Sequence, residues 1–231
     1  MKKLLLATVA AVGLTAAAPM AEAAIGVIPT PGSTQPNNVI APLTLVEGHY
    51  GVDLFLVGGP AQITATLIGS EAGATNTFEW NGATIFTIAG TSPGGVGTLG
   101  APVGTNSVFN NVLSGLLPFA FTSTVPNGDV TNGANALPGL GLGNFFVTLA
   151  NCSAVACIDN VQNGVTPGSG TVAWLFLDDL GNSVDDNHDD MVVRLEITGG
   201  SFTVPEPASL GLLGAGLLGL GFAARRRRKT A

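Results

Sequence analysis

The chain has 231 residues, of which 46% are hydrophobic and only 10% charged, and this composition excludes a disordered protein. Two cysteines exclude a disulfide scaffold or a cysteine–zinc protein, and 33 glycines with 14 prolines exclude a mainly helical bundle. The formal charge of −7 argues against nucleic acid as a partner, because phosphate binding needs clustered Lys and Arg.

The N-terminus carries the three regions of a secretory signal peptide. Two lysines follow the first methionine, and residues 4–18 form an uncharged run of apolar and small side chains. Ala21 and Ala23 then stand at the −3 and −1 positions of a cleavage site. We therefore expect residues 1–23 to be a signal peptide that directs export. The next segment, 24–38, is rich in proline and is predicted to be irregular.

Residues 39–203 are predicted to form one domain made of short strands. Apolar runs of strand length recur between turn residues, and no window of a dozen residues has convincing helical periodicity. Asn81-Gly82 is the strongest hairpin signal, because a type I′ turn needs positive φ at both central positions. The stretches 91–106 and 126–144 are expected to be loops. The expected strands are residues 50–57, 62–68, 77–80, 83–89, 107–113, 119–123, 145–150, 171–177 and 191–198.

The fold class that follows is all-β. We expect a single antiparallel β-sandwich, flanked by the N-terminal signal peptide and a C-terminal transmembrane helix. A jelly-roll order and an immunoglobulin-like order both stay open, because one sequence does not reveal which strands pair.

An acidic loop, 178–190, lies between the last two expected strands and holds six of the thirteen acidic residues of segment 24–204. Arg194 is the only Lys or Arg in that segment, so its net formal charge is −12. Carboxylates so close together repel one another unless a cation neutralises them or water screens them. Oxygen ligands on a loop suit Ca²⁺, the candidate cofactor. The candidate metal ligands are Asp178, Asp179, Asp185, Asn187, Asp189 and Asp190.

The loop does not match a complete EF-hand. Asp185, Asn187 and Asp189 have the 1-3-5 spacing of that motif, but its sixth position is Asp190 where the motif needs glycine. The alternative to a calcium site is a solvated acidic turn, whose charges cap backbone amides or keep the sheet end from pairing with another molecule. We interpret His188 as a solvated residue of this loop.

Cys152 and Cys157 are separated by four residues. Because an exported chain enters an oxidising compartment, we expect them to form a disulfide that holds a tight turn.

Three unlike features follow one another at the C-terminus, in region 204–231. Pro205-Glu206-Pro207 comes first. The uncharged residues 208–224 follow, which as a helix would span about 25 Å, near the lower limit for crossing a bilayer. The end is strongly basic and resists translocation, which predicts a cytoplasmic C-terminus and an external body. The basic residues are Arg225, Arg226, Arg227, Arg228 and Lys229.

This order of motif, span and basic end closely resembles the PEP-CTERM sorting signal. The resemblance implies that an exosortase, a membrane transpeptidase-like enzyme, processes the tail. It also implies export, transient residence in the inner membrane, and release to the cell surface or extracellular matrix, commonly alongside exopolysaccharide production. A permanent tail anchor is the alternative. Residues 67–78 and 174–194 are also similar to stretches of such proteins, which implies a class and no activity.

No catalytic residues are predicted. The sequence has no G-x-S-x-G motif, and nothing pairs a nucleophilic serine with either histidine. We therefore expect a non-enzymatic structural or adhesive protein of the cell surface or biofilm matrix, with an exosortase and exopolysaccharide as partners. One alternative is a calcium-dependent binding module that uses loop 178–190. The other is a carbohydrate-active enzyme, which would need two suitably placed carboxylates.

Overall fold

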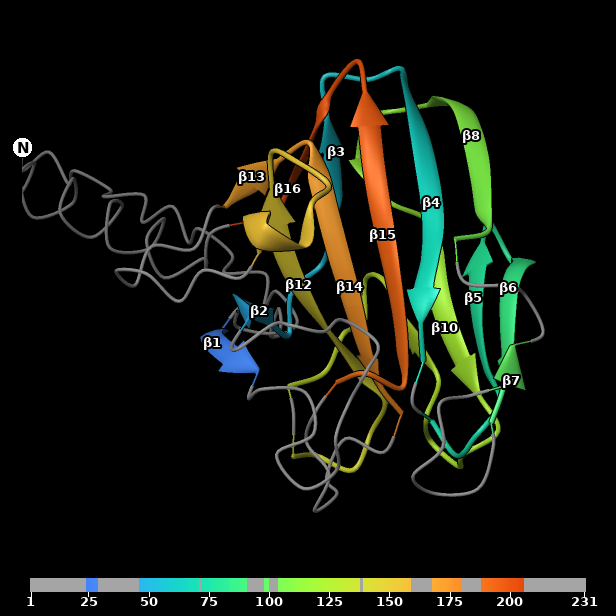
Figure 1. The fold of residues 1–231 in the computed structure, drawn as a ribbon. Coiled ribbons are helices and arrows are strands. Elements are labelled where there is room, and N and C mark those ends of the chain that lie inside the picture. Colours follow the sequence, from blue (N-terminus) through green and yellow to red (C-terminus); the bar gives the residue numbers. More distant parts are fainter. Residues whose placement is uncertain are drawn as a thin grey trace, which may run out of the picture.

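The computed structural model describes residues 24–28, 46–70, 72–90, 98–99, 104–137, 139–158, 168–179 and 188–205. These residues form strands and one short 3-10 helix, η1 (Val155–Cys157), so the prediction of an all-β body is confirmed (Figure 1). The strands are β1 (Ala24–Ile28), β2 (Val46–Tyr50), β3 (Phe55–Val57), β4 (Ala61–Gly69), β5 (Asn76–Trp80), β6 (Ala83–Ala89), β7 (Thr98–Leu99), β8 (Asn106–Val112), β9 (Gly115–Leu116), β10 (Phe119–Ser123), β11 (Val130–Thr131), β12 (Asn144–Ala150), β13 (Ser169–Gly170), β14 (Val172–Asp178), β15 (Met191–Thr198) and β16 (Ser201–Thr203).

The described strands belong to three sheets. The largest has seven strands in the order β1-β2-β12-β14-β15-β4-β8, the second has the order β11-β10-β5-β6-β7, and the third has the order β13-β16-β3-β9. All of these pairings are antiparallel, as predicted. The expected neighbours on either side of the acidic loop, β14 and β15, pair directly, with Leu177 opposite Met191.

The hairpin predicted at Asn81-Gly82 is confirmed. β5 and β6 pair across this turn, and Asn81 and Gly82 have φ values of 52° and 73°. Both central residues are therefore in the left-handed region that a type I′ turn requires.

Two predictions about the N-terminal half are wrong. The single strand expected over 50–57 is divided between the end of β2 and the start of β3, because the chain turns at Gly51, where φ is 61°. The segment 24–38, expected to be irregular, begins with β1, which pairs with β2 along its whole length. Residues 29–38 lie outside the described residues.

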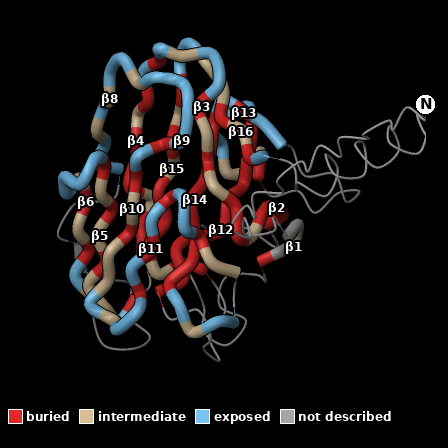
Figure 2. The backbone as a smooth tube through the Cα atoms, turned by 180° about the vertical axis from the view of Figure 1, so that it is seen from behind, coloured by how far each residue is buried: buried red, intermediate tan, exposed pale blue. Residues whose placement is uncertain are grey.

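One apolar cluster joins the three sheets. Alternate residues of β14, such as Leu175, contribute to it from the large sheet, and Leu56 of β3 contributes from the smallest. Phe119 and Phe121 of β10 contact Phe145 of β12, with ring centroids 5.3 and 6.1 Å apart. The two smaller sheets therefore pack against one face of the large sheet. Figure 2 shows the buried residues running along β12, β14 and β15.

The opposite face of the large sheet is also covered. Trp174 of β14 belongs to a second apolar cluster with Ile28 of β1, Val46 of β2 and Ile158 after η1. Because β14 is buried on both faces, its sequence is an unbroken apolar run over 172–177 rather than an alternating one.

Two buried asparagines hold the connection between β11 and β12 against the irregular segment 51–54. Asn132 accepts a hydrogen bond from Leu54 N and donates to the carbonyls of Leu54 and Leu117, each at 2.8 Å. Asn135 makes three similar bonds to this segment and to the start of β12. These bonds fold part of stretch 126–144, expected to be a long loop, onto the body, and β11 lies within it.

The last described residues leave the body directly from its smallest sheet. β16 lies between β13 and β3. Val204 is buried, and its N–H donates to the carbonyl of Gly168 at 3.1 Å. Pro205 follows and is exposed. Val204, the last buried residue that the structure describes, therefore immediately precedes Pro205-Glu206-Pro207.

Candidate functional site

The two ends of the acidic loop meet at one end of the large sheet. Asp178 is the last residue of β14, and Asp190 immediately precedes β15. Asp190 N donates to Leu177 O at 3.1 Å, and Asp179 N donates to the Asp190 carboxylate at 2.8 Å. Strand pairing therefore brings four predicted ligands together. We call Asp178, Asp179, Asp189 and Asp190 the acidic cluster.

The acidic cluster is more buried than a surface turn. Asp178, Asp179 and Asp189 are only 2–4% exposed, and Asp190 is half-buried. Burial raises the pKa of Asp179, against hydrogen bonds from Asn76 and Ser123 that lower it. The pKa of Asp190 is raised well above its usual range, first by burial and then by the charge of Asp179. Both shifts indicate that ionising Asp179 and Asp190 together is unfavourable without a compensating charge.

Neighbouring strands supply polar partners that the sequence did not single out. Asn76 at the start of β5 donates to Asp190 O at 3.2 Å, and Ser123 at the end of β10 donates to the Asp179 carboxylate at 3.1 Å. Asn76 is fully buried, and among the described residues its side-chain oxygen has no hydrogen-bond partner. No local signal marks these residues, because their role depends on how distant strands are arranged.

The interpretation of His188 as a solvated residue is wrong. Its side chain is fully buried, with Nε2 2.8 Å from the side-chain oxygen of Asn144 and 4.0 Å from Asp178. Tyr50 and Phe146 present ring edges to it at centroid distances of 5.2 and 6.3 Å. Partners from β2 and β12 thus bury a residue whose acidic sequence neighbours suggest exposure.

The described residues do not complete a metal site. No group of three or more His, Cys, Asp or Glu side chains within the described ranges is arranged to hold a metal ion. Two predicted ligands, Asp185 and Asn187, lie outside the described residues. Calcium binding therefore stays a prediction.

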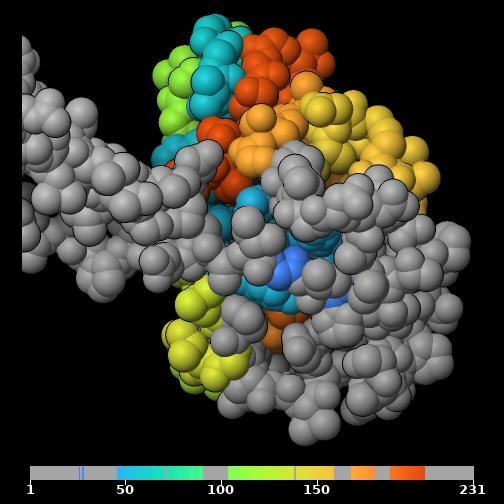
Figure 3. All heavy atoms as spheres, turned by 90° about the vertical axis from the view of Figure 1, so that its left-hand side faces the viewer, coloured from blue at the N-terminus to red at the C-terminus, as the bar shows by residue number. Residues whose placement is uncertain are grey.

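Cys152 and Cys157 form a disulfide, with their Cα atoms 6.1 Å apart. The closed segment lies beside β14 on the outer face of the large sheet, where Figure 3 shows yellow atoms of this region against orange atoms of the following strands. Arg194 of β15 donates to Ser153 O at 3.1 Å, and its guanidinium carbon lies 5.4 Å from the ring centroid of Trp174. Arg194 thus joins the disulfide segment to the sheet by a hydrogen bond, and its cation–π contact with Trp174 holds the guanidinium against β14.

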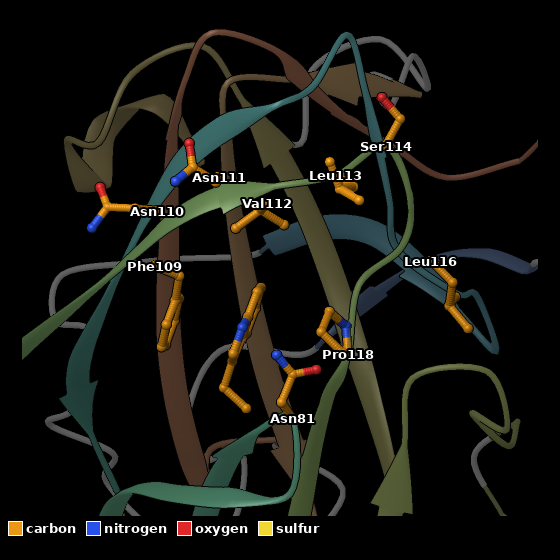
Figure 4. A pocket seen from close by; sticks show the side chains of 10 residues that line it. Asn81, Phe109, Asn110, Asn111, Val112, Leu113, Ser114, Leu116 and Pro118 are labelled. Atoms are coloured by element: carbon orange, nitrogen blue, oxygen red, sulfur yellow. The ribbon is translucent and has the colours of Figure 1, made fainter.

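A separate cavity of about 580 Å³ opens beside β8 (Figure 4). Trp80 of β5 and Phe109 of β8 stack beside it with centroids 4.2 Å apart and planes 3° from parallel. None of the residues that line the cavity is titratable. They are Trp80, Asn81, Phe109, Asn110, Asn111, Val112, Leu113, Ser114, Leu116 and Pro118.

Most of the predicted sorting region follows the described residues. Pro205 is described, whereas Glu206, Pro207, the expected span 208–224 and the basic cluster at 225–229 are not. Within the described ranges, no helix has the length and apolar character needed to cross a membrane. The predicted signal peptide, residues 1–23, also lies outside the described residues.

Comparison with known proteins assigns the C-terminal region. The family model for the PEP-CTERM protein-sorting motif matches residues 203–228. A search of the curated proteins finds no match to the chain. The match covers the proline motif, the uncharged stretch and most of the basic cluster, in the order that the sequence suggests, and it begins where β16 ends. The chain is therefore a PEP-CTERM protein, exported and sorted by an exosortase at a membrane.

Proposed function

We propose that the body has a non-enzymatic structural or adhesive role at the cell surface or in the extracellular matrix, in association with exopolysaccharide. The observation that carries this proposal is the sorting motif placed directly after a folded, strongly acidic β body. Exosortase processing delivers such a body away from the cytoplasm. The net formal charge of −12 over segment 24–204 also repels anionic membranes after release.

The first test follows the chain through cell fractions. Without exosortase, we expect the tail to remain in the inner membrane and the released protein to fall at least tenfold, because five basic residues oppose translocation of the C-terminus. Immunoblots of membrane, surface and medium fractions measure this. Restoring the exosortase gene is the control.

Replacing Glu206 by alanine in the wild-type strain tests the motif itself. We expect the Glu206→Ala chain to be retained in the membrane. The matched control is Glu79→Ala in the body, which should leave release unchanged. Equal release of the full-length chain with and without exosortase contradicts the proposal and favours a permanent anchor or another route.

We also propose that the body is one β-sandwich, as the sequence predicts. One apolar cluster joins the three described sheets, and the two smaller sheets together cover one face of the large sheet. A jelly-roll and an immunoglobulin-like strand order both remain available to this proposal.

A calcium-dependent binding module is the second candidate function. Its support is that Asp179 and Asp190 meet beside Asn76, whose buried side-chain oxygen has no hydrogen-bond partner within the described part of the chain. A hard cation accepts carboxylate and amide oxygens together and would offset the cost of burying several negative charges.

Thermal unfolding with calcium and with EDTA tests this candidate. At dissociation constants of about 10⁻⁴ to 10⁻³ M, 1 mM Ca²⁺ is expected to stabilise the protein by about 0.4 to 1.4 kcal/mol. Asp179→Asn should remove that gain, and Glu79→Gln, outside the acidic cluster, should keep it. Melting curves that respond to neither calcium nor EDTA would contradict a calcium-dependent function.

No observation favours the carbohydrate-active enzyme. Glycoside hydrolysis needs two carboxylates that face a bound sugar. The cavity beside β8 is lined without any carboxylate, and the acidic cluster is buried at the end of the large sheet.

A further inference from the structure

We propose that the cavity beside β8 binds a neutral carbohydrate. This inference deepens the adhesive role proposed above, and it rests on that role for its biological setting. The cavity has about 580 Å³, within the range of roughly 300 to 1,000 Å³ that is usual for small-ligand sites. It lies apart from the acidic cluster, because the two share no residue.

The lining combines apolar faces with neutral hydrogen-bonding groups. The stacked pair of Trp80 and Phe109 and the ring of Pro118 provide the apolar part. An aromatic face is electron-rich and attracts the polarised C–H groups on one face of a sugar ring. Figure 4 shows Phe109 and Pro118 on opposite sides of the cavity, with Val112 between them at its upper side.

Three of the lining residues are asparagines. Asn81 comes from the β5–β6 turn, and Asn110 and Asn111 come from β8, all three exposed. Each amide both donates and accepts hydrogen bonds, as a vicinal pair of sugar hydroxyls does. Figure 4 shows Asn81 beside Pro118, on the same side of β8 as Phe109, whereas Asn110 and Asn111 lie on the other side of that strand. Asn81 can therefore engage hydroxyls of a ring whose C–H face lies on Phe109 or Pro118, and the other two asparagines can bond only to a ligand that extends past β8.

The walls of the cavity are held in place by bonds that do not involve a ligand. Asn81 N donates to Pro118 O at 2.8 Å, which joins the β5–β6 turn to the segment between β9 and β10. The Asn110 side-chain oxygen accepts from Gln62 at 2.8 Å, and the Ser114 hydroxyl accepts from Gly59 N at 2.9 Å. A site held in this way loses little conformational entropy when a ligand enters.

The absence of charge in the lining selects among ligand classes. An anionic ligand is disfavoured, because the cavity has no cationic side chain among its lining residues and segment 24–204 has a net formal charge of −12. A cation would find no carboxylate among the lining residues. A wholly apolar ligand would leave the amides without partners, at a cost for each desolvated group. A neutral, hydroxyl-rich ligand with an apolar face satisfies all of these conditions.

Titration calorimetry on the full chain tests the proposal. The protein is kept in a zwitterionic detergent, because detergents with sugar headgroups would compete. The probes are neutral hexasaccharides of β-1,4-linked glucose, mannose and N-acetylglucosamine, with hexagalacturonate as the charged comparison. We expect saturable binding of at least one neutral hexasaccharide and at least tenfold weaker binding of hexagalacturonate.

Two matched pairs of substitutions assign binding to the cavity. Asn111 has φ 56°, so Asn111→Gly removes the amide without backbone strain, and Asn127→Gly at φ 65° is the same change outside the cavity. Leu113 is 73% exposed in the lining, and Leu140 is 64% exposed elsewhere. Asn111→Gly and Leu113→Ser should each weaken binding about fivefold, whereas Asn127→Gly and Leu140→Ser should not change it.

Three results would overturn the proposal: no neutral hexasaccharide binds, hexagalacturonate binds as tightly, or each cavity variant binds like its control. Cell fractionation separates this failure from that of the proposed function. If the chain is released normally by exosortase but binds no sugar, only the carbohydrate site is refuted. If the chain binds sugar but is never released, only the surface role is refuted.

Discussion

Asn135→Ala is expected to lower the free energy of unfolding by about 3 to 5 kcal/mol. The Asn135 side chain donates to the carbonyls of Val52 and Phe145 at 3.0 and 2.7 Å and accepts from Phe145 N at 2.9 Å. Asn135 is 2% exposed, so alanine leaves three backbone groups buried without partners, each costing about 1 to 3 kcal/mol. Urea denaturation followed by fluorescence measures the loss.

An exposed asparagine provides the control for this substitution. Asn110 makes one exposed hydrogen bond, with Gln62, and Asn110→Ala should cost less than about 1 kcal/mol. A loss at Asn135 no larger than at Asn110 would show that water or a shift of segment 51–54 replaces the missing bonds. The buried asparagines would then not be what holds the β11–β12 connection.

Asp190→Asn is expected to stabilise the protein at neutral pH in the presence of EDTA. Burial and the charge of Asp179 raise the pKa of Asp190 in the folded state above its ordinary value of 3.8. The folded state therefore binds more protons than the unfolded state between these two pKa values, and stability falls as pH rises through that interval. Each unit by which the pKa is raised costs about 1.4 kcal/mol at a pH above the folded pKa.

The amide removes this cost and keeps the local bond, because its oxygen can still accept from Asp179 N. The gain should disappear near pH 4, where the carboxyl of the wild type is largely protonated. Unfolding free energies from pH 4 to 8 measure the effect, and Glu79→Gln is the control outside the acidic cluster. Destabilisation by Asp190→Asn at pH 7 in EDTA contradicts this account. A gain in EDTA that becomes a loss with calcium would support the calcium candidate.

Most strands could be predicted because their signal is local. The alternation in β4 and the Asn-Gly turn between β5 and β6 are visible within a few residues. The irregular segment 51–54 could not be predicted, because Asn132 and Asn135, about 80 positions away, supply its hydrogen-bond partners. Local composition suggests a strand over 51–54, but hydrogen bonds to distant residues hold this segment in an irregular conformation.

The candidate site, like the fold, could be predicted only where its signal is local. The pairing of β14 with β15 follows from two adjacent apolar runs, and it brings Asp178 and Asp190 together. The polar partners of the acidic cluster did not follow, since Asn76 and Ser123, which bond to Asp190 and Asp179, come from the second sheet. The cavity beside β8 had no signal at all, because Trp80 and Phe109 are 29 positions apart and each belongs to an ordinary strand pattern.

The short distance between β16 and the sorting motif limits how an enzyme can reach it. Val204 is anchored to Gly168, and an extended residue spans at most about 3.6 Å, so Glu206 stays within about 7 Å of that anchor. An enzyme that recognises Pro205-Glu206-Pro207 therefore has to accommodate β16 and the neighbouring backbone of Gly168 next to the bound peptide.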